Sequence, residues 1–241
     1  LQANNGENNL HGGKKAFDKV FWQGQEVQTE DGSAIEFTYL SRDGEEGFPG
    51  NLSVKVIFTL TETNELKIDY TATTDKNTVV NLTHHSYFNL GGQGNGDILS
   101  HMLKIEADKF IPIDKTSIPI GQLKSVENTP FDFRQPKEIG KEINADDEQL
   151  KNCNGYDHNF VLDEGNHQDK QAAVLSDLDS GRRMIISTSQ PGLQLYTCNW
   201  SADTDAGKNG SIYQARSFVC LEPQHFPDSP NHPAFPDTTL K

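Results

Sequence analysis

Alternation of apolar and polar side chains with a period of two is the feature that most restricts what this chain can fold into. Segments 53–61 and 65–73 carry apolar residues at every second position: Val54, Val56, Phe58 and Leu60 in the first, and Leu66, Ile68 and Tyr70 in the second. This period is typical of a β-strand with one buried face. Thr63 and Asn64 predict a turn, so the two segments are expected to form a hairpin.

Further strand-like segments follow at short intervals, separated by turns rich in Gly, Asp and Asn. The predicted strands are 79–88, 102–107, 172–177, 184–188, 193–198 and 218–221. Helical periodicity is scarce, and the best helix candidate is the short segment 145–151. Many short strands joined by turns predict an all-β sandwich. The sequence has no linker, repeat or low-complexity segment, so a single domain over residues 1–241 is the simplest organisation.

Composition narrows the range of partners. The net charge of −14 argues against nucleic acid and against an anionic membrane surface, because both require clustered Lys and Arg. No apolar run approaches the length of a transmembrane helix. The three cysteines form no C-x-x-C pair, so neither a zinc site nor a disulfide framework is expected. Their odd number slightly favours a reducing compartment such as the cytoplasm, and nothing in the sequence predicts the oligomeric state.

The predicted strand 79–88 contains two adjacent histidines. Alternation places Thr83, His85 and Tyr87 on one face, and His84, Ser86 and Phe88 on the other. Only one histidine can therefore be directed at a given ligand. An imidazole titrates near neutral pH, so such a residue can exchange protons with a substrate. The alternative, from the residues alone, is a hydrogen-bonded structural histidine.

A second candidate is the carboxylate of Glu222, directly after the apolar segment 218–221. Alternation puts Cys220 and Glu222 on one face, and Pro223 is expected to end the strand. A carboxylate at a strand end that points into a cleft would be partly desolvated. Desolvation would raise its pKa towards a value useful to a general base.

The segment Asn81 to Leu90, read as N-L-T-H-H-S-Y-F-N-L, resembles the signature of the aldose 1-epimerases, the galactose mutarotases. His84 stands where that family usually has Asn. Other blocks that are similar to the family's motifs follow in the family's order: 8–13, 44–52, 155–160, 190–197 and 220–224. The resemblance extends essentially from residue 4 to residue 236.

The resemblance implies a large antiparallel β-sandwich, often called a supersandwich, and interconversion of the α and β anomers of free hexoses such as galactose and glucose. It also implies roles for particular residues. His85 would be the catalytic acid and Glu222 the catalytic base, on opposite sides of the sugar. His11 would contact the ring oxygen, and Asp157 and Gln194 would bind sugar hydroxyls. Neither a cofactor nor a metal is implied.

Family members also carry an arginine-bearing N-terminal segment and final strands that this sequence does not contain. We therefore expect a fragment, truncated at both ends, of an aldose 1-epimerase-like domain. Two alternatives to the mutarotase stay open: a non-catalytic carbohydrate-binding fragment, and a hexose-6-phosphate 1-epimerase. The latter would need an Arg or Lys cluster for the phosphate, and Lys14-Lys15 and Arg182-Arg183 are the only tight basic pairs.

Overall fold

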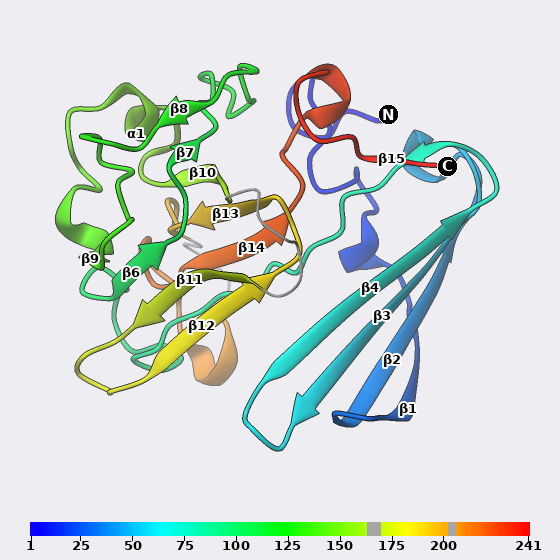
Figure 1. Cartoon of the computed structure of the whole chain (residues 1–241), viewed down its shortest axis with the longest axis horizontal. Coiled ribbons are helices and arrows are strands. Elements are labelled where there is room, and N and C mark those ends of the chain that lie inside the picture. The colour runs from blue at the N-terminus through cyan, green and yellow to red at the C-terminus, as the bar shows by residue number, and fades with distance from the viewer. Residues whose placement is uncertain (163–169, 202–205) are drawn as a thin grey trace. The chain divides into compact units, whose positions relative to one another are not determined.

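Antiparallel sheet dominates the regular structure of residues 1–162, 170–201 and 206–241, which are the residues that the computed structural model describes (Figure 1). The chain divides into two units: residues 1–82 with 238–241, and residues 83–237. Each unit is described by itself, and the single-domain organisation stays a prediction. The all-β fold with antiparallel sheets is confirmed.

The first unit contains a four-stranded meander in which neighbouring strands pair in chain order. The strands are β1 Gln23–Thr29, β2 Gly32–Ser41, β3 Leu52–Thr61 and β4 Leu66–Thr74; β5 Thr78–Val79 pairs separately with β15 Thr239–Leu240. The predicted hairpin at 53–73 is confirmed by β3 and β4. Its Val54 and Val56 are buried against the neighbouring Trp22.

The predicted apolar face is only partly buried. Leu60 and Leu66 are partners across β3 and β4, beside the hairpin turn, and both are more than 60% exposed. The alternating pattern correctly placed both residues on the apolar face of the hairpin. The apolar cluster around Val54 does not extend to the tip of the hairpin, so they stay exposed. The strands β1 and β2 were not predicted.

The second unit contains two antiparallel sheets, visible in Figure 1 as the groups β10, β13, β14 and β6, β11, β12. One sheet has the order β14-β13-β10-β7-β8, with bounds Cys220–Gln224, Gly192–Tyr196, Asp157–Val161, Lys109–Phe110 and Lys124–Ser125. The other has the order β12-β11-β6-β9, with bounds Arg183–Thr188, Lys170–Ser176, Met102–Ile105 and Lys137–Glu138. Short 3-10 helices occur at Phe17–Lys19, Glu45–Gly47, Ile139–Lys141, Lys208–Gly210 and Ser229–Asn231.

Both sheets contribute side chains to one apolar core. Leu103 and Leu175 come from the second sheet, and Phe160, Leu195 and Leu221 from the first, all fully buried. Every second residue of β10, β13 and β14 thus faces this core, so the residues between them face the other way. That opposite face of the first sheet carries the candidate site.

The only α-helix among the described residues, α1 Glu148–Cys153, begins three residues later than predicted. Asp147 caps it by accepting hydrogen bonds from the backbone N–H groups of Gln149 and Leu150, and Asn154 ends it in the left-handed conformation. The described residues include no helix long and apolar enough to cross a membrane. All three cysteines are buried free thiols.

Candidate active site

Strand register gathers six side chains on the face of the first sheet that points away from the core. Gln194 pairs with Glu222 across β13 and β14, and Tyr196 pairs with Cys220. On the other side of β13, Asp157 pairs with Tyr196 and Asn159 with Gln194. We call these six residues the polar face: Asp157, Asn159, Gln194, Tyr196, Cys220 and Glu222. Three predicted site residues from distant parts of the sequence therefore lie on one surface.

The segment 83–88 lies along the free edge of β14, but it is not the strand that the sequence predicted. Phe88 and Val219 exchange two backbone hydrogen bonds of 2.9 Å. Continuing this antiparallel register places Tyr87 opposite Cys220 and His85 opposite Glu222. At the far end, Thr83 Oγ1 donates a hydrogen bond of 2.8 Å to the carbonyl oxygen of Pro223.

Pro223 limits how far a ladder can extend along this edge of β14. Val219 donates its N–H towards residue 88, so alternation directs the backbone of residue 223 towards the same side. Proline has no N–H to donate, and the ladder cannot continue. The prediction that Pro223 ends its strand is also wrong, because β14 runs on to Gln224. The missing donor falls on the side away from β13, where an edge strand tolerates it.

The alternation predicted for this segment nevertheless holds. The rings of His85 and Tyr87 lie 5.0 Å apart, and the ring of His84 lies 6.3 Å from that of Phe88. His85 thus faces the site, and His84 faces away. An extended backbone keeps the two-residue alternation even without a hydrogen-bonded partner.

His85 and Glu222 meet at the centre of the site. His85 Nε2 lies 3.6 Å from Glu222 Oε1, with the imidazole 31% exposed and the carboxylate 8% exposed. The ring of Tyr196 lies 6.3 Å from that of His85, on the side of β13. At 3.6 Å the two groups lie side by side, and their placement around a bound sugar stays a prediction.

The two carboxyl groups of the polar face are poorly solvated. Burial, and secondarily the charge of Asp157, raises the pKa of Glu222 to about 8. Burial also raises the pKa of Asp157, to about 6, although the hydrogen bond from Gln194 opposes the shift. Loss of water disfavours the charged form of an acid, and a nearby like charge adds to the effect. A carboxyl group with such a pKa is a stronger base than an ordinary glutamate.

Gln194 and Asn159 leave two buried acceptors on the polar face. Gln194 Nε2 donates a hydrogen bond of 2.7 Å to Asp157 Oδ1. The side-chain amide oxygens Gln194 Oε1 and Asn159 Oδ1 are buried, and neither has a hydrogen-bond partner among the described residues. Buried acceptors normally find a donor, so the face suits a ligand with several hydroxyl groups. The sequence reading missed Asn159, which could have been found because it lies two residues after Asp157 on the same strand.

His11, the remaining predicted site residue, belongs to the first unit. It lies in an exposed turn at a positive φ of 55°. The carboxylate of Glu46 packs against Gly13, where it leaves no room for a Cβ atom, and accepts hydrogen bonds from the backbone N–H groups of Lys14 and Lys15. Two sequence motifs therefore form one loop structure, and contact of His11 with a sugar stays a prediction.

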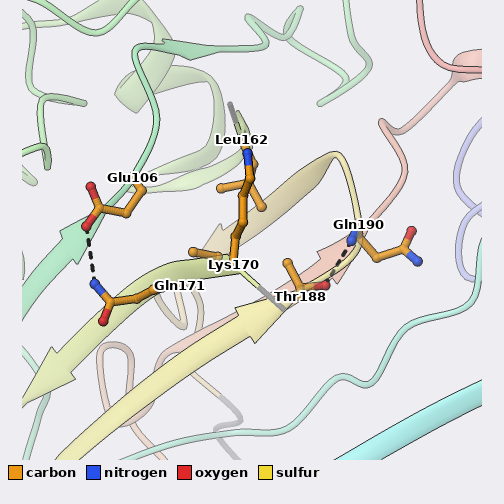
Figure 2. A pocket seen from close by; sticks show the side chains of 7 residues that line it. Glu106, Leu162, Lys170, Gln171, Thr188 and Gln190 are labelled. Carbon is orange, nitrogen blue, oxygen red and sulfur yellow. Dashed lines mark hydrogen bonds between the residues drawn. The ribbon is translucent and has the colours of Figure 1, made fainter. Parts of the chain in front are cut away.

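Figure 2 shows a separate hollow in the second unit, near the beginning of β11. It is lined by Glu106, Leu162, Lys170, Gln171, Ala172, Thr188 and Gln190. Gln171 donates a hydrogen bond of 3.2 Å to Glu106 across it. None of the predicted site residues lines this hollow.

The sequence model of a known family, aldose 1-epimerase, matches residues 1–241. This chain belongs to the aldose 1-epimerase family. Among its relatives, galactose mutarotase from Bos taurus is 45% identical over 241 residues, which are 100% of this chain and 67% of that protein. Aldose 1-epimerase from Escherichia coli (strain K12) is 41% identical over 236 residues, which are 98% of this chain and 66% of that protein.

Solved structures of this family share the fold. The GalM/aldose epimerase homologue from C. elegans superposes with a TM-score of 0.87 at 30% identity, covering 100% of this chain and 70% of that one. Galactose 1-epimerase from Lactobacillus acidophilus NCFM gives a TM-score of 0.85 at 32% identity, covering 100% and 68%. The mutarotase-like fold and the isomerase class predicted from the sequence are therefore confirmed for the chain.

Proposed function

We propose that this chain interconverts the α and β anomers of free hexoses such as galactose and glucose, with Glu222 as base and His85 as acid. The observation that carries this proposal is the distance of 3.6 Å between His85 Nε2 and Glu222 Oε1 on a buried polar face. The anomeric hydroxyl and the ring oxygen of a cyclic aldose are bonded to the same carbon. An acid and a base that lie side by side can therefore reach both oxygens.

In the proposed reaction the Glu222 carboxylate removes the proton of the anomeric hydroxyl. The protonated imidazole of His85 donates a proton to the ring oxygen, and the bond between that oxygen and the anomeric carbon breaks. The open-chain aldehyde turns about its bond to the neighbouring carbon, and the ring closes on the other face with the two roles exchanged. A positioned acid or base typically contributes about 10²–10⁴-fold to such a rate.

Hydroxyl groups remote from the reacting carbon would bind along the polar face. The Asp157 carboxyl group and the carbonyl oxygen of Gln194 can each accept a hydrogen bond there, as can Asn159 Oδ1 at the next position. Sites that hydrogen-bond hydroxyl groups discriminate strongly against analogues that lack them, because a buried acceptor would then stay unpaired.

Polarimetry of freshly dissolved α-galactose tests the proposal, with the spontaneous rate subtracted. We expect the chain to accelerate the approach to equilibrium. Calorimetric binding of galactose without acceleration would instead indicate a non-catalytic carbohydrate-binding protein. Glucose 6-phosphate should react at least about tenfold more slowly than glucose, because none of the six residues of the polar face is an Arg or Lys that could bind a phosphate. A preference for the phosphate would favour a hexose-6-phosphate 1-epimerase.

Thr83→Val should slow anomer interconversion while lowering the unfolding free energy only slightly. The substitution removes the hydrogen bond to the carbonyl oxygen of Pro223, which fixes one end of the segment that carries His85. We expect a rate reduced about 5- to 10-fold and a loss of about 1 kcal/mol in unfolding free energy, measured by polarimetry and urea denaturation. Thr116→Val, at an exposed turn, is a matched control that should leave the rate unchanged. An unaltered rate in Thr83→Val would mean that this hydrogen bond does not position His85.

A further inference from the structure

Three side chains of different chemistry converge at the centre of the polar face. One donor atom each from His85, Cys220 and Glu222 lies within 4.8 Å of the other two. Cys220 and Glu222 are two residues apart on the same face of β14, and the register of segment 83–88 brings His85 opposite Glu222. We propose that this trio binds a thiophilic divalent cation of the Zn²⁺ class, and that the cation and the sugar exclude each other.

The spacing of the trio suits a tetrahedral ion. Zinc lies about 2.0–2.3 Å from imidazole nitrogen, carboxylate oxygen and thiolate sulfur, which places neighbouring ligand atoms about 3.5 Å apart in a tetrahedron. His85 Nε2 and Glu222 Oε1 are 3.6 Å apart without an ion. Side-chain adjustments of about 1 Å would bring the thiol to the same distance. A ligand from solvent would complete the four positions.

The donor set also selects the kind of cation. Thiolate and imidazole are ligands for Zn²⁺ and related transition metals, whereas Mg²⁺ and Ca²⁺ require mainly oxygen ligands. Two of the ligands become anionic on binding, so a divalent cation leaves the three side chains and the ion neutral overall. Neutrality matters because Cys220 is fully buried and Glu222 nearly so. Sequence spacing could not reveal this site, since His85 lies 135 positions before Cys220 in the chain.

The cation and the sugar exclude each other because both require the same atoms of His85 and Glu222. Binding displaces the Cys220 thiol proton into solvent, together with the Glu222 proton where that group is protonated. The ion then occupies His85 Nε2 and the Glu222 carboxylate, which the proposed function assigns to proton transfer. The exclusion of sugar by the cation rests on that proposed function, whereas the binding of the cation does not.

Cobalt provides a probe of binding that is independent of catalysis. Titration of the full chain with Co²⁺ under anaerobic conditions should give one equivalent of a tetrahedral complex, with a thiolate-to-cobalt absorption band in the near ultraviolet. Cys220→Ala should abolish the band. Cys153→Ala is the matched control and should retain it, because that buried thiol lies by α1 and donates to backbone oxygens there. A missing band, or a band that survives Cys220→Ala, would overturn the proposal.

Two further measurements keep the test decisive. His85→Ala, at a partly exposed position, should weaken Co²⁺ binding at least tenfold, so the result does not depend on one buried substitution. Zn²⁺ should inhibit anomer interconversion competitively with galactose, whereas Mg²⁺ should not inhibit it. Cys220→Ala should raise the inhibition constant of Zn²⁺ at least tenfold. Cobalt binding in a chain without mutarotase activity would overturn only the proposed function. Activity without a cobalt band or zinc inhibition would overturn only the cation site.

Discussion

Glu222→Gln is expected to slow anomer interconversion by about 10²–10⁴-fold and, at the same time, to stabilise the fold. Glutamine keeps the shape of the side chain but cannot accept the proton of an anomeric hydroxyl. Polarimetry measures the rate. Because the pKa of Glu222 is raised to about 8, kcat/KM of the unsubstituted chain should show a rising step towards about pH 8 as Glu222 ionises, separate from the falling limb that marks loss of the His85 proton. The residual rate of the variant should lack that step.

The expected gain in stability follows from the same shift. Glutamate in an unfolded chain has an ordinary pKa of 4.5, against about 8 in the fold. Between these values the unfolded chain has released the proton that the folded chain retains, so stability falls as pH rises from 4.5 to 8. The full penalty applies above pH 8 and amounts to roughly 3–5 kcal/mol, at 1.36 kcal/mol per pKa unit. Glutamine cannot ionise, and so avoids the penalty.

Urea denaturation at two pH values checks the sign. The variant should be more stable than the unsubstituted chain at about pH 9. The two should be nearly equally stable at about pH 4, where Glu222 is largely protonated in the folded and in the unfolded chain. Glu138→Gln is the matched control, since Glu138 is exposed on β9 and should change neither rate nor stability. A normal rate in Glu222→Gln would remove this residue as the base. An absent stability gain at pH 9 would show that its carboxylate is well solvated.

The alternation of side chains along the sequence correctly predicted which face of an extended segment each residue lies on. Alternation placed Glu222 and Cys220 on one face of β14, and His85 and His84 on opposite faces of their segment, as the structure confirms. These are properties of an extended backbone and need no knowledge of neighbours. By the same alternation, His158 lies on the opposite face of β10 from Asp157, and it is fully buried.

Pairing between distant segments could not be read in this way. Segment 79–88 has the composition of a strand, but whether it forms one depends on its pairing with β14, and the structure shows only the bridge between Phe88 and Val219 there. The hydrogen bond from Gln194 to Asp157 requires β13 and β10 to be neighbours, although the two residues lie 37 positions apart. The burial of Asn159 depends on the same strand order. Strand order is a property of the whole sheet, and no local pattern of residues contains it.

His158→Leu is expected to remove a contribution that weakens the fold in mild acid, so that the variant becomes more stable as pH falls from 7 to about 5. His158 is fully buried among aromatic rings, 4.6 Å from the ring of Phe131 and 5.8 Å from that of Phe110. Its Nδ1 accepts a hydrogen bond of 3.1 Å from the backbone N–H of Asp157. Burial lowers the pKa of His158 from 6.5 to about 3, because the charged form would lose its hydration.

The stability contribution of His158 changes with pH in the opposite direction to that of Glu222. Below pH 6.5 the unfolded chain binds a proton that the folded chain refuses, so stability falls as pH drops from 6.5 towards 3. By pH 4 the loss amounts to about 3 kcal/mol. Leucine has no group to protonate, so the substitution removes this acid-dependent loss of stability. It costs about 1 kcal/mol at pH 7, where the hydrogen bond from Asp157 is lost.

Urea denaturation between pH 7 and pH 4 separates the two buried groups. Acidification over this range weakens the fold through His158 and strengthens it through Glu222 and Asp157, so these contributions oppose each other in the unsubstituted chain. His158→Leu should therefore leave the gain from Glu222 exposed, and the single variant should become more stable as pH falls from 7 to about 5. His232→Gln, in the loop after β14, is the control and should keep the original profile. If the stability of His158→Leu followed the same pH profile as that of the unsubstituted chain, His158 would not be the group that resists protonation.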